Sequence, residues 1–92
     1  MTYHVYLIIT LRKNRYISYV GYSKNIKKRI DLHNSSKGAK FTKGNYWILI
    51  YKKSYISKKN AIKAEYMLKK NHKLRSKLKK KYLDENSSTT TF

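Results

Sequence analysis

Glu65 is the residue of this sequence whose position says most about chemistry. It falls on the apolar face of a predicted helix, together with Ala61 and Leu68. A carboxylate there needs a partner, because burying a bare charge is costly. One such partner is Mg²⁺, which binds through one or two protein oxygens, keeps most of its waters and takes up a substrate phosphate. The other is an ion pair with one of the nearby lysines, and the pattern leaves both readings open.

Arg29 and His33 form a second candidate pair, one helical turn apart and beside two isoleucines. An arginine that is held in place can grip a phosphate through two hydrogen bonds, and a nearby histidine can donate to that phosphate or move protons. The structural alternative is an arginine bonded to a carboxylate or a strand end, with the histidine packed at the rim of the core.

Tyr6 and Tyr19 lie one on each strand of a predicted hairpin. Taken singly, their expected role is cross-strand packing of aromatic rings. A phenol has an ordinary pKa near 10. It can therefore act as a general base only where a metal-bound water or a positive field eases the loss of its proton.

Three strands must position these residues. Residues 3–9 and 16–20 are rich in β-branched and aromatic side chains, and the polar turn between them contains Asn14, which suits a left-handed conformation. Gly21 closes the second strand, where a glycine indicates a close approach of the backbone or a special dihedral angle. Residues 46–51 form the third and most apolar strand.

Helices are predicted from caps and from apolar spacing. The first begins after Ser23 as its N-cap, and its apolar face carries Ile26, Ile30 and His33. Residues 38–44 form a basic connection between two glycines, with one turn of helix. The second helix opens at Ser57, and one face carries Ala61, Ile62, Glu65 and Leu68. The third is strongly basic, and the apolar stripe that docks it on the sheet consists of Leu74, Leu78 and Tyr82.

The order ββαβαα predicts an α+β fold, a three-stranded antiparallel sheet flanked by helices. A chain of 92 residues has room for one domain. We expect that domain over residues 1–83 and a polar tail, without periodicity, over residues 84–92.

The composition limits the class of protein. Lys and Arg number 23 against four acidic residues, a net charge of +19 that favours a polyanionic partner. A hydrophobic content of 40% and ten tyrosines argue against disorder. The absence of cysteine excludes disulfides and thiolate metal sites. The longest apolar run, residues 5–9, is too short for a bilayer span or a signal-peptide core, so we expect an intracellular protein, cytoplasmic or nuclear.

Taken together, these residues resemble a GIY-YIG endonuclease domain. The first motif is present as His4-Val5-Tyr6, with His4 in place of the glycine, and the second as Tyr19-Val20-Gly21. Arg29 follows eight residues later, as in the family, and Glu65 falls where the family's metal-binding glutamate is expected.

The chain is most similar to the small stand-alone group of that family. Residues 33–34, 38–42 and 61–70 resemble stretches of this group. Trp47 after a glycine is similar to the nuclease domain of structure-selective relatives, whose additional zinc-binding domain this chain has neither the length nor the cysteines to form. Lys77 stands where some relatives carry an asparagine.

The resemblance implies hydrolysis of phosphodiester bonds in DNA with a single divalent metal ion, Mg²⁺ or Mn²⁺. Glu65 would hold the metal, and Tyr6 or Tyr19 would act as the base toward water, with Tyr6 favoured. Arg29 would stabilise charge on the phosphoryl oxygens, and His33 would orient the phosphate or the base. No other cofactor is implied.

The leading hypothesis is thus a metal-dependent endonuclease acting on branched or nicked DNA, in DNA repair or recombination. We expect a monomer or homodimer, with a protein partner that supplies specificity and no membrane partner. The alternative is a nucleic-acid-binding domain on the same fold with little or no catalysis, and a third hypothesis is membrane-surface binding through residues 69–83. The cations expected to contact nucleic acid are Lys28, Lys37, Lys40, Lys43, Lys69, Lys70, Lys73 and Arg75.

Overall fold

The computed structural model describes residues 2–87 and has the expected ββαβαα order. One antiparallel sheet has the strand order β2-β1-β3. Its strands are β1 (Tyr3–Arg12), β2 (Arg15–Ser23) and β3 (Ile48–Tyr55). The helices are α1 (Ile26–Asn34), α2 (Lys58–Lys70) and α3 (His72–Ser87), with one 3₁₀ turn, η1 (Lys40–Thr42). The predicted α+β fold with a three-stranded antiparallel sheet is therefore confirmed.

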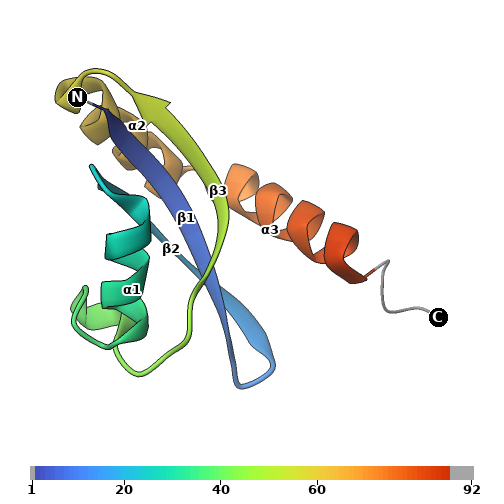
Figure 1. The fold of residues 1–92 in the computed structure, drawn as a ribbon. Coiled ribbons are helices and arrows are strands. Elements are labelled where there is room, and N and C mark those ends of the chain that lie inside the picture. The colour runs from blue at the N-terminus through green and yellow to red at the C-terminus, as the bar shows by residue number, and fades with distance from the viewer. Residues whose placement is uncertain (1, 88–92) are drawn as a thin grey trace.

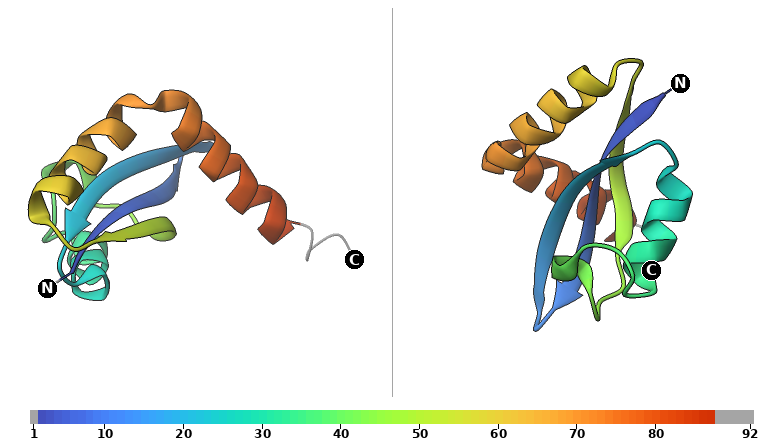
Figure 2. Two further views of the ribbon diagram at one scale, coloured as in Figure 1. Left: turned by 90° about the horizontal axis from the view of Figure 1, so that it is seen from above. Right: turned by 90° about the vertical axis from the view of Figure 1, so that its left-hand side faces the viewer.

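The sheet separates two helical layers. Helix α1 covers one face, and α2 with the beginning of α3 covers the other, as the right-hand view of Figure 2 shows. Along β1, alternate side chains face opposite sides. Tyr6 and Ile8 pack with Trp47 on the α1 side, while Val5 and Leu7 pack on the α2 side. The rest of α3 extends past the sheet (Figure 1).

A two-residue turn joins β1 and β2. Lys13 and Asn14 both have positive φ angles, 50° and 64°, which match the right-handed twist of a hairpin. The predicted left-handed conformation of Asn14 is confirmed. The register of this hairpin sets Tyr6 opposite Gly21 and Ile8 opposite Tyr19.

The N-cap of α1 is Asn25, so the prediction of Ser23 is wrong. The Asn25 side chain accepts a hydrogen bond from the Lys28 amide at 3.1 Å, as an N-cap does. Ser23 instead accepts from the amide of Asn25 at 3.1 Å and shapes the turn before the helix. The predicted N-cap of α2, Ser57, is confirmed by its bond with the Asn60 amide.

Strand β3 begins two residues later than predicted, at Ile48, and extends to Tyr55. The amide of Trp47 donates to the side-chain oxygen of Asn34 at 2.6 Å, and the carbonyl of Tyr46 accepts from the Thr10 hydroxyl at 2.7 Å. Side chains thus take these backbone groups, which in a strand would bond to β1.

The buried face of α2 and the end of α3 also differ from what the sequence predicted. Ile62 is 43% exposed, so the face that α2 buries carries Ala64 beside Ala61 and Leu68 rather than Ile62. Helix α3 runs to Ser87, which places residues 84–87 in the helix rather than in a tail. The remainder of the predicted tail, residues 88–92, lies outside the described residues. Within residues 2–87, no helix has the length and apolar character that a membrane crossing requires.

Candidate active site

Two buried hydrogen bonds connect β1, α1 and η1 through their side chains. The Tyr6 phenol oxygen lies 2.8 Å from Nε2 of His33, and Nδ1 of His33 lies 2.8 Å from the Thr42 hydroxyl. All three residues are at most 1% exposed. The Thr42 hydroxyl in turn donates to the carbonyl of Ala39 at 2.8 Å. The sheet, a helix and a loop therefore meet at one histidine.

The Thr42–Ala39 bond sets the direction of the other two. A threonine hydroxyl has one proton, and here it goes to a carbonyl, so Thr42 accepts from the Nδ1–H of His33. Nε2 of the neutral ring then has only a lone pair, and Tyr6 donates to it. Burial and the charge of Arg29 lower the pKa of His33, which favours this neutral ring near pH 7. The phenol proton of Tyr6 is thus hydrogen-bonded to the lone pair of Nε2 of His33.

Two glycines make room for this histidine and its partner. A Cβ atom on Gly21 would overlap the phenol oxygen of Tyr6. A Cβ atom on Gly38 would lie 2.6 Å from Nδ1 of His33, far inside contact distance. Of the two roles that the sequence left open for Gly21, the close approach is present, and Gly38 makes the corresponding space beside Nδ1 of His33.

Tyr19 packs on the same histidine without a hydrogen bond to it. Its ring centroid is 5.3 Å from that of His33, at an interplanar angle of 63°, and the ring of Tyr6 lies 5.9 Å from His33 at 62°. The two tyrosines thus meet the histidine edge-on. Tyr19 is only half-buried, whereas Tyr6 is 1% exposed.

Arg29 brings a positive charge to this group. Its Nε is buried and has no hydrogen-bond partner in the described part of the chain. Arg29 also lines a small cleft of about 240 Å³ together with Lys24 and Lys28. A charged donor left without a partner beside two lysines is a setting that an anion would complete.

The electrostatics at Tyr6 have opposing causes. Burial raises the pKa of Tyr6 to about 12, and Arg29 opposes this rise, while Tyr19 and Glu65 add to it. An influence of Glu65 on Tyr6 indicates that this carboxylate acts on the same group, although it lies on α2.

Glu65 is ion-paired in the structure. Its carboxylate lies 3.6 Å from Nζ of Lys69, and its side chain is 18% exposed. Among residues 2–87, no three His, Cys, Asp or Glu side chains gather into a metal site. A single, partly exposed carboxylate fits Mg²⁺ or Mn²⁺ only in the manner in which water and substrate phosphate supply the other ligands. The lysine pair, one of the two readings that the sequence left open, is present, and the metal role stays a prediction.

Comparison with known proteins decides the family. Residues 2–82 match the family model described as the GIY-YIG catalytic domain. The chain belongs to the GIY-YIG family. The resemblance found in the sequence is therefore confirmed, and with it membership of a nuclease superfamily.

Relatives of this GIY-YIG chain carry the name UPF0213. The UPF0213 protein YazA of Bacillus subtilis is 36% identical over 83 residues, which are 89% of this chain and 79% of YazA. A UPF0213 protein of Streptococcus pneumoniae is 38% identical over 69 residues, 74% of this chain and 67% of the relative. The solution NMR structure of UPF0213 protein BH0048 from Bacillus halodurans is 34% identical, covers 75% of this chain and 71% of its own, and gives a TM-score of 0.41.

The family motifs of this GIY-YIG chain can now be located. Tyr6, Tyr19 and His33 are in direct contact, and the charge of Arg29 acts on both Tyr6 and His33. Glu65 acts on this group through its charge. His4 replaces the motif glycine, and its Nδ1 is 2.8 Å from the Ser54 hydroxyl on β3.

Three residues that support the site were not among the predicted ones. Thr42 holds His33, Gly38 gives it space, and Asn34 fixes Trp47 through two hydrogen bonds of 2.6 and 3.2 Å. All three fall in the stretches by which the chain resembles the stand-alone GIY-YIG group. That resemblance was the available signal, although it assigned them no role.

The predicted nucleic-acid contacts divide by exposure. The seven lysines are exposed, whereas Arg75 is half-buried and its Nε is enclosed, without a partner in the described residues. Nζ of Lys70 lies 4.6 Å from the ring centroid of Tyr66. The lysines are therefore the more available cations of this set.

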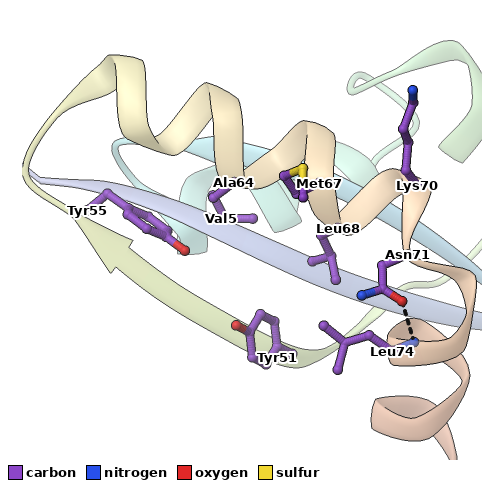
Figure 3. A pocket seen from close by; sticks show the side chains of 9 residues that line it. All are labelled: Val5, Tyr51, Tyr55, Ala64, Met67, Leu68, Lys70, Asn71 and Leu74. Atoms are coloured by element: carbon purple, nitrogen blue, oxygen red, sulfur yellow. Dashed lines mark hydrogen bonds between the residues drawn. The ribbon is translucent and has the colours of Figure 1, made fainter.

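One pocket of the GIY-YIG domain is separate from these residues. It has a volume of about 490 Å³, lies between α2, β3 and the start of α3, and is mainly apolar (Figure 3). Its lining consists of Val5, Tyr51, Tyr55, Ala64, Met67, Leu68, Lys70, Asn71 and Leu74. None of the five predicted catalytic residues is among them. Asn71 accepts a hydrogen bond from the Leu74 amide at 3.0 Å and so caps α3.

Proposed function

We propose that this GIY-YIG chain hydrolyses phosphodiester bonds in DNA, with one divalent metal ion held by Glu65. The observation that supports this best is the hydrogen bond from the Tyr6 phenol to a neutral His33, beside Arg29, whose Nε has no partner in the described residues. A proton acceptor and a phosphate-binding cation are the two groups that attack of water on a phosphodiester needs from the protein.

Tyr6 is the base in this proposal, and His33 receives the proton that Tyr6 gives up. As water attacks phosphorus, Tyr6 takes a proton from the water while its own proton moves to Nε2 of His33. The bond from phosphorus to the 3′ oxygen breaks at the same centre. The resulting imidazolium keeps its Nδ1–H on Thr42. A phenol whose pKa burial raises to about 12 can serve in this way because no free tyrosinate has to persist.

Access to water favours the other tyrosine. Tyr6 is 1% exposed, whereas Tyr19 is half-buried and lies nearer the surface. Proton transfer and access therefore point to different phenols. We assign the base to Tyr6, because among residues 2–87 the Tyr19 hydroxyl has no proton acceptor comparable to His33. His33 is itself buried and bonded at both ring nitrogens, which supports a role in orienting the base rather than the phosphate.

Arg29 binds the scissile phosphate in this proposal. Its unpartnered Nε and the two lysines of the same cleft, Lys24 and Lys28, supply positive charge where negative charge develops on the phosphoryl oxygens. Mg²⁺ or Mn²⁺ bound at Glu65 would polarise the phosphate and favour departure of the 3′ oxygen. Branched or nicked DNA is the proposed substrate, and repair or recombination the proposed context.

A domain that binds nucleic acid without cutting it is the second candidate. Two observations favour this second candidate. Glu65, the proposed metal ligand, is already paired with Lys69, and Tyr6, the proposed base, is almost completely buried. The exposed lysines serve either function equally, since phosphate contacts need no catalysis.

A cleavage assay with labelled DNA separates the two candidates. Linear and four-way-branched DNA are incubated with the protein in Mg²⁺, Mn²⁺ or chelator. Glu65→Gln is run alongside Glu85→Gln, which makes the same chemical change on α3. We expect metal-dependent cutting by the parent and by Glu85→Gln, and none by Glu65→Gln. Binding without cutting in every metal, equal for all three proteins, would establish a binding domain.

A further inference from the structure

Phe41 is the outer member of an aromatic array that begins at the Tyr6–His33 pair. Its ring lies nearly parallel to that of Tyr19, with centroids 6.0 Å apart and an interplanar angle of 20°, and Tyr19 in turn meets His33. The ring centroid of Trp47 is 6.1 Å from that of Phe41. Trp47 and His33 are buried, whereas Phe41 is 50% exposed. The array thus leads from the proposed proton acceptor to an aromatic surface in water.

The turn that carries Phe41 is held firmly. Thr42, the next residue, is bonded to His33 and to the carbonyl of Ala39. The carbonyl of Thr42 accepts from the indole N–H of Trp47 at 2.9 Å. Because its backbone and its inner neighbours are fixed, a ligand that binds on Phe41 has little ordering of this ring to accomplish.

One cation lies over this ring, and two more flank Phe41 in the sequence. The guanidinium carbon of Arg12 lies 5.9 Å from the centroid of Phe41, and Nε of Arg12 donates to Asn45 at 3.4 Å. Lys40 and Lys43 flank Phe41 in the sequence, and both are exposed. No acidic residue occurs between positions 31 and 65. An exposed ring among cations, with no carboxylate in its own segment, combines the two features of surfaces that bind single-stranded nucleic acid.

We propose that Phe41 is a stacking platform for an unpaired nucleotide base next to the scissile phosphate, with Arg12 moving from the face of the ring to the backbone phosphate of that nucleotide. In a duplex the faces of the bases are covered by their neighbours, so only a base that is unpaired or extruded can lie on an aromatic ring. The platform therefore selects DNA with a single-stranded segment, such as a flap, a gap or an open junction. This inference rests on the proposed function, because it specifies which DNA reaches the same site.

Binding in chelator tests the platform without any need for catalysis. Fluorescence anisotropy is measured with a short labelled single-stranded DNA and with a duplex of the same sequence. Phe41→Ala and Phe41→Leu should bind the single strand about 5- to 150-fold more weakly than the parent, the range expected for loss of one stacked base. Their binding to the duplex should stay within about twofold of the parent, because the duplex offers no base face. Phe41→Tyr, which keeps a ring, should bind as the parent does.

Tyr46→Ala is the matched control. Tyr46 is 71% exposed and lies five residues from Phe41, but its ring has no aromatic contact in the described array. This variant should bind both DNAs as the parent does. A single strand with abasic sites provides a second control, since it keeps the phosphates and removes the bases. The parent should lose affinity for the abasic strand, and Phe41→Leu should lose no more, because the two changes remove one interaction.

Circular dichroism first shows that Phe41→Leu is folded. The platform is refuted if this variant binds the single strand as the parent does, or if it loses the same affinity for the single strand and for the duplex. Cleavage in Mg²⁺ is scored separately. A protein that binds single strands through Phe41 and cuts no DNA retains the platform and refutes the proposed hydrolysis. A protein that cuts single-stranded and duplex DNA alike, with or without the ring of Phe41, retains the hydrolysis and refutes the platform.

Discussion

The phenol oxygen of Tyr6 and Nε2 of His33 lie 2.8 Å apart inside the protein, and Tyr6 is the donor between them. That direction follows from Thr42, whose single proton is given to the Ala39 carbonyl, so that the histidine must offer its Nδ1–H to Thr42 and its lone pair to Tyr6. The bond joins a buried phenol to the lone pair of an uncharged histidine. It forms a short path for one proton, and Gly21 and Gly38 give that path its space.

Removing the phenol oxygens one at a time tests which tyrosine is the base. Tyr6→Phe should lower the cleavage rate by about 100-fold or more, the usual worth of a general base, while Tyr19→Phe should change it far less. Single-turnover cleavage of labelled DNA measures both. An unchanged cleavage rate in Tyr6→Phe beside an inactive Tyr19→Phe would reverse the assignment.

Tyr6→Phe also leaves Nε2 of His33 without its donor, so this variant should lose about 1–3 kcal/mol of unfolding free energy.

Acid should destabilise the fold through His33. Burial and Arg29 lower the pKa of His33 in the folded chain, whereas in the unfolded chain a histidine takes up its proton near pH 6.5. Below that pH the unfolded state binds more protons, so the unfolding free energy falls as the pH drops from about 6.5 toward the lower folded pKa. Urea denaturation at several pH values gives the slope.

Two histidine variants serve as controls for that slope. His33→Gln should flatten the dependence of the unfolding free energy between about pH 5 and 6.5, because it removes the group that is buried neutral. His72→Gln changes an exposed histidine at the start of α3 and should leave the slope as it is. Equal slopes in the parent and His33→Gln would contradict the role assigned to His33.

Replacing each glycine by alanine should distinguish glycines that are needed for space from a glycine that is needed for its backbone conformation. At Gly21 and Gly38 a Cβ atom would meet Tyr6 and His33, so both variants should lose stability and cleavage together. Gly44 has a φ of 82° and no atom within 4 Å of its missing Cβ. Gly44→Ala should therefore cost about 1–2 kcal/mol of stability through its left-handed backbone and leave cleavage unchanged. Thermal unfolding and the cleavage assay are compared for all three variants, and a fully active Gly21→Ala would contradict the packing described.

Thr42 should prove a positioning residue for His33. Thr42→Val keeps the shape and removes the acceptor for the Nδ1–H, while Thr42→Ser keeps the hydroxyl. We expect Thr42→Val to lose about 1–3 kcal/mol of unfolding free energy and to shift His33 toward the other neutral tautomer, with its proton on Nε2. ¹⁵N NMR of the imidazole reports that tautomer directly. Thr42→Ser should restore both the stability and the tautomer, and an unchanged spectrum in Thr42→Val would remove Thr42 from the chain of hydrogen bonds.

Local patterns in the sequence determined the elements of this protein. Alternating and four-residue spacings identify three strands and three helices, Asn14 marks the hairpin turn, and Ser57 caps α2. These signals are local, because the period of a strand or helix and the chemistry of a turn or cap are set by residues a few positions apart. The resemblance to the GIY-YIG family rests on such short stretches as well.

The tertiary structure decided which polar groups meet. His33 is bonded to Tyr6, 27 positions away, and to Thr42, nine positions away, and neither partner follows from a local spacing. The start of β3 depends on Asn34, whose side chain takes the amide of Trp47. The sequence indicated a close approach or a special dihedral angle at Gly21, but only the packing of β1 against β2 shows that the glycine makes room for the Tyr6 phenol oxygen. Buried polar groups find their partners through the packing of distant segments, because each must be satisfied wherever the fold places it.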